Sequence, residues 1–285
     1  EANGIPVGNI LQSAAQFGDA VYLVVNNSQQ IIVANAGSLK QEAVITGFQS
    51  PRFMKVVSGD KAYVTDWVSN SVRIVNVKTN SISGSIPTGI GPENMAQIGT
   101  KLFVANSGGF GADSTITVIN TLTDQVEGSF VVGPNPSSIQ VDVNGNIWVL
   151  CAGVSDWQDP TKDVGGKLVQ VDRTTFTIMK SIDFPNNTDH PAKLSLNEAG
   201  TVLYYLSSGY GGDVFKMSIS ETMLPQSAFI SGTFYGIGVD PLNDDVYTSD
   251  PLDYNQRGIV YRYSSNAQMI DSVRAGVIPG YFLFR

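Results

Sequence analysis

Large aromatic residues recur in polar, glycine-rich segments of this chain, where strand formation does not require them. Five such segments carry one ring each and shorter segments add two more: Trp67, Phe110, Trp157, Tyr210 and Tyr254, with Phe48 and Tyr235. Rings gathered on one surface offer flat apolar area with polar edges, which suits a large planar or amphipathic ligand. Each ring could instead pack over its own strands, although a shared exposed cluster is typical of an interaction surface.

Polar side chains in the same segments could hydrogen bond the amide groups of such a ligand. The candidates are Asp66, Asn106, Asp156, Gln158, Asp159, Asp250, Asp253 and Arg257. Asp and Asn also cap turns by bonding the nearby backbone, so that interpretation stays open for them. Arg52 and Glu93 begin equivalent strands, and they are expected either to face the ligand or to pair with each other.

Catalytic chemistry finds little support in the sequence. His190 is the only histidine, which excludes a metal site built from several histidines and leaves one candidate base for a Ser-His-Asp triad. It lies in Asn187-Thr-Asp-His-Pro191, a predicted turn, and the chain has no Gly-x-Ser-x-Gly sequence. We therefore expect a protein that is not an enzyme and that uses no metal and no cofactor.

The composition is that of a β-rich globular protein. Apolar residues make up 42% of the 285 residues and charged residues 15%, which argues against disorder. The formal charge of −8 argues against a nucleic-acid partner, since such a partner requires clustered Lys and Arg. No apolar run approaches the roughly 18 residues of a membrane-spanning helix. The single cysteine, Cys151, is expected to be buried and inert.

A short aromatic strand pattern recurs six times and indicates the architecture. Its copies each end on a small or polar residue: 21–25, 62–66, 102–106, 147–151, 203–207 and 246–250. An apolar strand that starts near Pro or Gly precedes each copy, and a third strand, a polar turn and an outer strand follow it. A unit of about 40–45 residues with four strands is typical of a β-propeller blade.

This spacing predicts an all-β chain folded as a single seven-bladed β-propeller domain over residues 1–285. The predicted blades cover 7–47, 48–88, 89–132, 133–184, 185–230 and 231–275, and residues 276–285 supply the inner strand of a seventh blade. Propellers close by letting one terminus complete the blade begun by the other, so the remaining strands of that blade are expected upstream of Glu1. The alternative is six blades, with the last strand packed elsewhere.

The repeat resembles a known family. Tyr63-Val-Thr-Asp66 is close to the Tyr-Val-Thr-Asn motif of YncE-like propellers, and other stretches extend the similarity over essentially the whole chain. These stretches are Val25-Asn-Asn-Ser28, Ile45-Thr-Gly-Phe-Gln-Ser-Pro-Arg52, Val239-Asp-Pro-Leu-Asn-Asp-Asp-Val-Tyr247, Arg257-Gly-Ile-Val-Tyr-Arg-Tyr263 and Gly276-Val-Ile-Pro-Gly280. Together they look like the Bacteroidetes surface layer protein propellers, which are exported lipoproteins of the outer membrane.

The resemblance implies a seven-bladed fold at the extracellular face of the outer membrane, held there by a lipid anchor upstream of this chain. It also implies a role shared with the cobalamin-capturing propellers that sit on TonB-dependent transporters. The signal and the anchoring cysteine are absent from the present sequence. Relatives are linked to other ligands, so the fold by itself does not identify the ligand.

These observations together predict a non-enzymatic, exported propeller that captures a cobalamin-type corrinoid for an outer-membrane transporter. The five loop rings and Tyr235 would stack on the ligand, while Arg257, Arg52, Asp66 and Asn106 would bind its amide periphery. One alternative is a protein-interaction scaffold or surface-layer component without a small ligand. A propeller hydrolase would need carboxylates that converge in the channel, and among the inner-strand starts only Glu93 supplies one.

Overall fold

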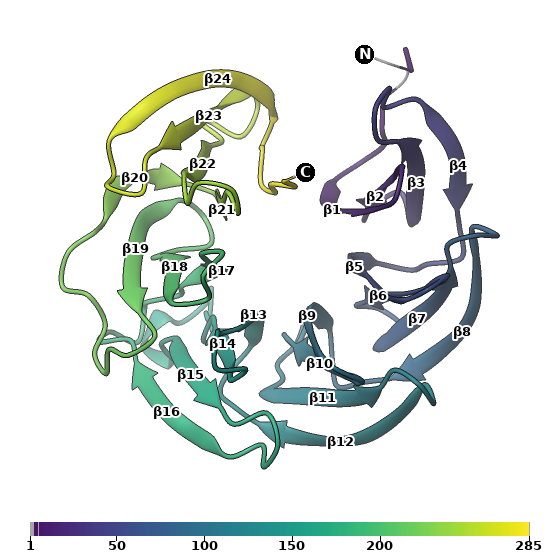
Figure 1. The fold of residues 1–285 in the computed structure, drawn as a ribbon. Coiled ribbons are helices and arrows are strands. Elements are labelled where there is room, and N and C mark those ends of the chain that lie inside the picture. The colour runs from purple at the N-terminus through teal and green to yellow at the C-terminus, as the bar shows by residue number, and fades with distance from the viewer. Residues whose placement is uncertain (1–2, 5, 285) are drawn as a thin grey trace. The chain divides into compact units, whose positions relative to one another are not determined.

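The computed structural model describes residues 3–4 and 6–284, and in them the chain folds into six antiparallel sheets of four strands each (Figure 1). Each strand pairs with the next strand along the chain, so every sheet is a simple meander. The sheets are the blades of a β-propeller, and we number them 1 to 6 in chain order. Within the described residues, no helix has the length and hydrophobicity that a membrane crossing requires.

The strand boundaries follow a regular order. Blades 1 to 3 contain β1 (Leu11–Phe17), β2 (Ala20–Val25), β3 (Gln30–Asn35), β4 (Gln41–Ile45), β5 (Pro51–Ser58), β6 (Lys61–Asp66), β7 (Ser71–Asn76), β8 (Ser81–Pro87), β9 (Pro92–Ile98), β10 (Lys101–Asn106), β11 (Thr115–Asn120) and β12 (Gln125–Val131). Blades 4 to 6 contain β13 (Pro136–Val141), β14 (Ile147–Cys151), the 3-10 helix η1 (Pro160–Lys162), β15 (Lys167–Val171), β16 (Ile178–Asp183), β17 (Ala192–Leu196), β18 (Val202–Leu206), β19 (Gly212–Ser218), β20 (Ile230–Phe234), β21 (Gly236–Val239), β22 (Val246–Asp250), β23 (Arg257–Tyr263) and β24 (Met269–Val277).

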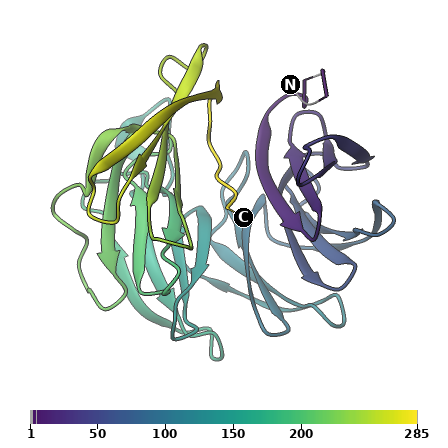
Figure 2. The same ribbon diagram turned by 45° about the horizontal axis from the view of Figure 1, so that its top comes forward.

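The blades belong to two compact units. The N-terminal unit, Glu1–Val131, holds blades 1 to 3, and the C-terminal unit, Val132–Arg285, holds blades 4 to 6. Within each unit the first strands of neighbouring blades lie side by side, and the fourth strands form the outer margin (Figures 1 and 2). In each unit, therefore, the loops after the second strands and the connections between blades emerge at the same end.

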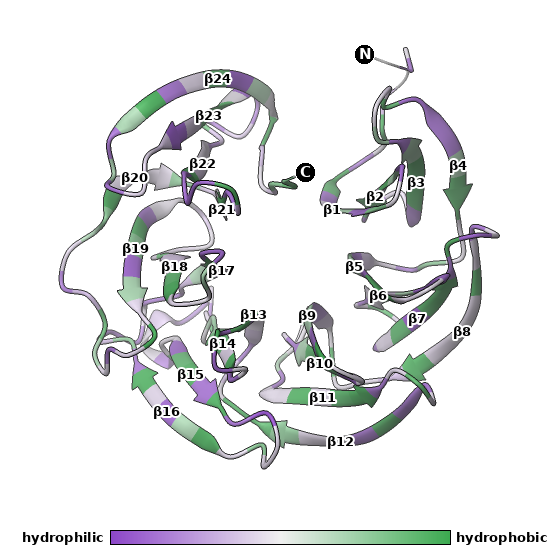
Figure 3. Ribbon diagram, viewed as in Figure 1, coloured by the Kyte–Doolittle hydropathy of each residue, from purple (hydrophilic) through white to green (hydrophobic). Residues whose placement is uncertain are grey.

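In blades 2 to 5 the second strand is the most buried strand. In β6 and β10 every residue except the first is buried, and β14 is buried throughout. The outer strand β12 instead has only exposed and half-buried residues. Figure 3 shows the same contrast, with hydrophobic residues dominating β3 and β11 and mixed residues along β24. Aromatic and β-branched residues favour the second strands because they pack well on a pleated surface with neighbours on both faces.

The hydrophobic cores lie between neighbouring blades. Tyr63 and Val72 of blade 2 pack in one cluster with Met95 and Leu102 of blade 3. In the C-terminal unit a second cluster joins blades 4 and 5, with the fully buried Trp148 and Tyr205 as its largest members. A blade is therefore stabilised by its neighbours, since each sheet buries its faces against the next sheet.

The strand pattern predicted from the sequence is confirmed for all six blades. The six aromatic copies are the second strands β2, β6, β10, β14, β18 and β22. Three of the predicted first strands begin at the expected prolines, Pro51, Pro92 and Pro136. The first strand of blade 1 begins at Leu11, a few residues later than the predicted position.

The prediction of a seventh blade is wrong: the described residues form six blades, as the alternative interpretation held. β24 ends at Val277, and residues 278–284 form no strand. Their side chains pack on blade 6 instead, where Phe282 and Phe284 lie with ring centroids 6.0 Å and 5.3 Å from the ring of Tyr247. The Pro-Gly-Tyr-Phe sequence has the composition of an inner strand, but among the described residues it lies close to Gly236 and Gly238 of β21 without pairing with a strand.

Cys151 should be unreactive in the native protein. It is fully buried at the end of β14, and burial raises the pKa of its thiol to about 12. Because the thiolate is the nucleophile, the group stays protonated and inert at pH 8. We expect no reaction with Ellman's reagent in native buffer and one equivalent of reactive thiol in guanidinium chloride. A rapid native reaction would contradict the burial.

Candidate functional site

A buried polar side chain at the end of the second strand holds the loops at one end of the N-terminal unit. Asp66 is fully buried, and its carboxylate accepts hydrogen bonds from the backbone N–H groups of Gln49 (2.8 Å) and Ser50 (2.9 Å). Asn26, its counterpart in blade 1, donates to the Ser50 hydroxyl (2.9 Å) and the Pro51 carbonyl (3.0 Å). Both side chains therefore brace the connection between blades 1 and 2.

Blade 3 repeats this arrangement with a longer loop. Asn106 is fully buried and donates to the hydroxyl groups of Thr115 and Thr117, both at 2.9 Å. Asp113 accepts from the backbone N–H groups of Ile90 (2.7 Å) and Thr115 (2.8 Å). Asp66 and Asn106, two predicted ligand-binding residues, thus bond within the protein: Asp66 caps the turn before β5, whereas Asn106 bonds two threonine hydroxyl groups of β11.

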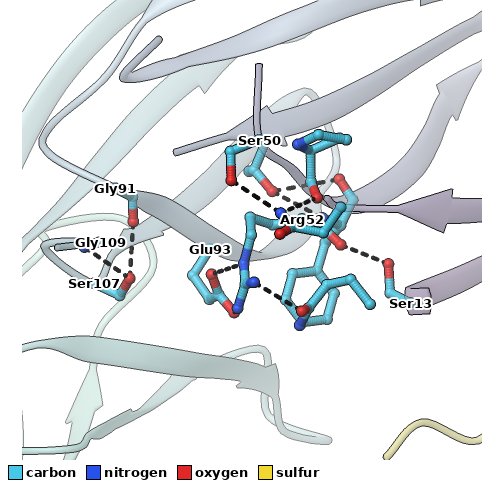
Figure 4. A network of polar contacts seen from close by, with 12 residues as sticks. Ser13, Ser50, Arg52, Gly91, Glu93, Ser107 and Gly109 are labelled. Atoms are coloured by element: carbon cyan, nitrogen blue, oxygen red, sulfur yellow. Dashed lines mark hydrogen bonds and ion pairs between the residues drawn. The ribbon is translucent and has the colours of Figure 1, made fainter. Parts of the chain in front are cut away.

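Arg52 and Glu93 pair with each other across blades 2 and 3 (Figure 4). The Arg52 Nε and one terminal nitrogen donate to the two carboxylate oxygens of Glu93, each at 2.8 Å, and its other terminal nitrogen donates to Gln12 Oε1 at 2.7 Å. The two side chains are only 14% and 10% exposed. Ser13 adds a hydrogen bond from its hydroxyl to the Arg52 carbonyl (2.6 Å). This bidentate, largely buried pair links all three blades of the unit.

The guanidinium of Arg52 also forms one layer of an aromatic stack. It lies 3.8 Å from the ring centroid of Trp67, and Trp67 meets Phe110 edge to face at 5.6 Å. Trp67 is half-buried, whereas Phe110 is 90% exposed. The N-terminal unit thus brings together three predicted site residues, Arg52, Trp67 and Phe110, with only the last fully open to solvent.

Two glycines allow the loop that carries Phe110 to approach this stack. Gly91 has φ +59°, and a Cβ added there would lie 2.1 Å from the backbone nitrogen of Gly109. Ser107 fixes the contact, because its backbone N–H and its hydroxyl each donate to the Gly91 carbonyl at 2.9 Å (Figure 4). Only glycine fits such a close approach of two backbones with a left-handed φ.

The C-terminal unit carries a longer set of rings, which we call the aromatic row: Trp157, Tyr210, Tyr254 and Tyr235. Trp157 meets Tyr210 edge to face at 5.8 Å, and Tyr254 meets Tyr235 at 5.9 Å. The Tyr254 hydroxyl donates to the Tyr210 carbonyl at 2.8 Å, which joins the two pairs. Burial raises the pKa of Tyr254, so this hydroxyl remains a donor. Loops of blades 4, 5 and 6 thereby form one continuous surface.

Exposure is high for two rings of the aromatic row and lower for Tyr254 and the half-buried Tyr235. Trp157 is 78% exposed, Tyr210 74% and Tyr254 37%. Tyr254 lies at a turn with φ +62°, held by Asp253, whose carboxylate accepts from the N–H groups of Asn255 and Gln256 at 3.0 Å each. Those backbone bonds lower the pKa of Asp253, so the carboxylate persists well into acid. The turn therefore presents the Tyr254 ring on a constrained backbone.

Trp157 lies in the insertion 152–166, which has internal structure of its own. Val154 and Val164 form a two-hydrogen-bond bridge at its base (2.8 and 2.9 Å), and Asp159 caps η1 by accepting from Thr161. Asp163 is buried and accepts from the backbone N–H of Asp156 at 2.7 Å. Gly166 N–H donates to the Asp189 carbonyl (2.8 Å), which ties the insertion to the next connection between blades.

His190 belongs to this arrangement, although from the sequence it was expected only to lie in a turn. Its Nε2 lies 3.1 Å from Asp163 Oδ2 and its Nδ1 lies 3.0 Å from the Ala152 carbonyl oxygen. Asp163 and His190 are 27 residues apart in sequence, with no spacing rule that relates them. A histidine that follows a blade connection with several acidic residues in the preceding insertion was the only available signal.

Other predicted site residues lie apart from these rings. Arg257 bonds the outer strand, donating from Nε to the Ala275 carbonyl at 2.7 Å, while Arg274 donates back to the Arg257 carbonyl. Phe48 is buried in the core between blades 1 and 2. Asp250 accepts from the backbone N–H of Leu252 at 2.7 Å, which fits turn capping.

The exposed rings and polar groups of these loops are suited to binding a ligand. Among the described residues, no group of three or more His, Cys, Asp or Glu side chains could hold a metal ion. A cavity of about 450 Å³ lies beside blade 5, lined by Phe184, Tyr205 and Phe215 with the loop 222–226. The aromatic row is separate from that cavity and forms open surface.

Comparisons with known proteins agree on the fold. A family model described as "Domain of unknown function (DUF5074)" matches residues 1–276. Hydrazine synthase of Kuenenia stuttgartiensis is similar in structure, with a TM-score of 0.72, 14% identity, and coverage of 98% of this chain and 91% of that one. A quinonprotein alcohol dehydrogenase-like protein of Bacteroides thetaiotaomicron has a TM-score of 0.66 and 13% identity, covering 93% of this chain and 65% of that one. No curated protein matches by sequence.

Proposed function

We propose that this chain, which belongs to the DUF5074 family, is a non-enzymatic binding protein whose ligand docks on the aromatic row of its C-terminal unit. The observation that carries the proposal is the exposure of Trp157, Tyr210 and Tyr254 on loops from three blades. Covering these rings would remove apolar area from water. Their edge contacts and braced loops already order them, so binding costs little additional side-chain entropy.

A cobalamin-type corrinoid matches the chemistry of this surface. A corrinoid is a broad macrocycle with a rim of amide groups, so the rings could cover one face of it. Polar groups of the same loops, among them Asp156, Gln158 and Asp253, flank the rings and could bond the amides. The resemblance of the repeats to YncE-like, cobalamin-capturing propellers supports the same ligand class.

In this proposal the protein acts at the extracellular face of the outer membrane and passes its ligand to a TonB-dependent transporter. A lipid anchor upstream of the present sequence would hold it there. The support for this placement is the resemblance to Bacteroidetes surface layer proteins.

Titration with cyanocobalamin, followed by calorimetry and by tryptophan fluorescence, tests the proposal. We expect saturable binding that Trp157→Ala weakens by about 5- to 30-fold, as for an aromatic anchor at the centre of an interface. Leu242→Ala is the matched control, because Leu242 is 84% exposed but lies in the turn after β21, remote from the row. The variant Phe110→Ala tests whether the rings of the N-terminal unit contribute to cyanocobalamin binding. Absence of binding by the wild-type protein would reject the corrinoid.

A second candidate is a protein-interaction scaffold without a small ligand. It is favoured by the openness of the row, since Trp157 and Tyr210 are exposed and lie outside the cavity beside blade 5. Protein interfaces are enriched in such Tyr and Trp anchors. If cyanocobalamin fails to bind, a purified TonB-dependent transporter ectodomain should bind the wild-type protein more tightly than Trp157→Ala.

A further inference from the structure

Both ring nitrogens of His190 face oxygen atoms that can only accept. Nδ1 lies 3.0 Å from the Ala152 carbonyl and Nε2 lies 3.1 Å from the Asp163 carboxylate. A neutral imidazole has one N–H, so it can donate to only one of these oxygens and turns a lone pair toward the other. The imidazolium donates to both. The arrangement therefore has its full set of hydrogen bonds only when His190 is protonated.

The next bonds lead from His190 to Trp157. Asp163 uses one carboxylate oxygen for His190 and the other for the backbone N–H of Asp156, at 2.7 Å. Asp156 directly precedes Trp157, and its carboxylate in turn accepts from the N–H groups of Gln158 and Asp159 (2.9 and 3.1 Å). The backbone on both sides of Trp157 is thus held by a short chain of bonds that begins at the imidazole.

We propose that His190 is a positioning residue whose protonation locks the insertion 152–166 and thereby tightens ligand binding at the aromatic row. The effect on affinity rests on the proposed function of that row. The protonated imidazole makes both hydrogen bonds, whereas the neutral imidazole keeps only one of them. Binding should therefore be tighter at pH 5.5 than at pH 8.

The segments that pack around His190 carry several other charged side chains. They are Asp156, Asp159, Lys162 and Asp163 of the insertion, Asp189 of the same loop as His190, and Lys167 and Asp183 of β15 and β16; of these, Asp163 contacts the imidazole. Lys162 pairs with Asp159, and Lys167 pairs with Asp183. The Asp156 N–H and the His190 bond lower the pKa of Asp163, so it is a carboxylate throughout. Imidazole is the group that titrates between about pH 5 and 8.

The effect of His190 protonation on the insertion 152–166, which we call the lock, can be measured without a ligand. His190 is the only histidine, so its carbon-bound protons give a single NMR titration curve. We expect the backbone amides of Asp156 and Trp157 to shift with the same midpoint. In a Trp67→Phe background, iodide should quench Trp157 more at pH 8 than at pH 5.5, since Trp148 is fully buried. The proposal would be overturned if the amide chemical shifts and the iodide quenching of Trp157 did not change with the protonation of the imidazole.

Two substitutions are expected to change the pH dependence in different ways. In His190→Gln the pH dependence should disappear, because the amide does not titrate. In Asp163→Asn the side-chain amide can donate to a neutral imidazole while still accepting from the Asp156 N–H. The pH dependence should then reverse, with the insertion tighter at pH 8. Unchanged pH dependence in Asp163→Asn contradicts the proposal even if His190→Gln is poorly folded.

The effect on ligand binding is tested by measuring the affinity for cyanocobalamin over the same pH range. For the wild-type protein we expect affinity to fall by about 5- to 10-fold from pH 5.5 to pH 8, which lies within the range of one ordinary net hydrogen bond. Binding that is equally tight at both pH values overturns the link from His190 to the row. Absence of binding at every pH rejects the proposed function and the affinity effect, whereas the ligand-free measurements still decide the lock.

Discussion

Replacing Trp148 with alanine is expected to lower the free energy of unfolding by about 3–5 kcal/mol, the range for a large aromatic residue removed from a packed core. Trp148 is fully buried between blades 4 and 5, and its Nε1–H donates to Asp142 Oδ2 at 3.0 Å. Asp142 is itself buried and also accepts from Gln170 (3.0 Å). The substitution therefore leaves a cavity and removes one donor from a buried carboxylate.

The two losses can be separated by Trp148→Phe. Phenylalanine keeps much of the ring volume but cannot donate to Asp142, so we expect a loss of about 1–3 kcal/mol. Trp157→Ala serves as the stability control, because its ring is 78% exposed and surface substitutions usually change stability by less than about 0.5 kcal/mol. Equilibrium unfolding in urea measures all three. A loss near zero for Trp148→Ala would contradict the core described here.

The second large effect is expected at the pair of Arg52 and Glu93. Glu93→Ala should lower the free energy of unfolding by about 3–5 kcal/mol, because it leaves a largely buried guanidinium without its carboxylate. The side chains are 14% and 10% exposed, so water cannot fully replace the lost partner. Arg52 also covers the Trp67 ring at 3.8 Å, so the fluorescence of Trp67 should change at the same time.

A double substitution tests whether that cost belongs to the unpaired charge. Arg52→Met combined with Glu93→Leu removes both charges and retains apolar volume, and such replacements are often neutral or stabilising. We expect the double variant to be more stable than Glu93→Ala alone. If the double variant is instead the less stable of the two, packing or hydrogen bonds to Gln12 carry the energy. The complete double-mutant cycle measures the coupling directly.

The fold was largely predictable because the strands and turns of each blade have a local sequence pattern that recurs along the chain. A second strand such as Ala62–Asp66 has an aromatic residue among β-branched neighbours and a polar terminus, and these are local signals. The predicted seventh blade was wrong because the same local signals do not show whether a strand has a partner. Whether Pro279–Phe284 forms a strand depends on a partner edge, and its rings pack on Tyr247 instead. Pairing is a tertiary property that composition does not encode.

For the candidate site, the sequence could single out residues but not the contacts among them. Loop rings such as Trp157 and Tyr210 could be singled out, because loops of polar residues do not need them. Which rings meet could not be read, since contacts such as that of Tyr254 with Tyr210 join residues of different blades. His190 and Asp163 were missed as a pair because their contact depends on how the insertion folds back. The roles of Asp66 and Asn106 depended on burial, which the sequence does not give.

The buried braces at the ends of the second strands have a consequence for how such proteins diversify. Asp66 and Asn106 secure the chain where it leaves the sheet, and the Val154–Val164 bridge does the same for the insertion. Residues beyond these anchors can change in type or number without altering strand register. Mutation can therefore retune recognition while thermal stability stays constant, so that one scaffold can acquire new specificities with few compensating changes.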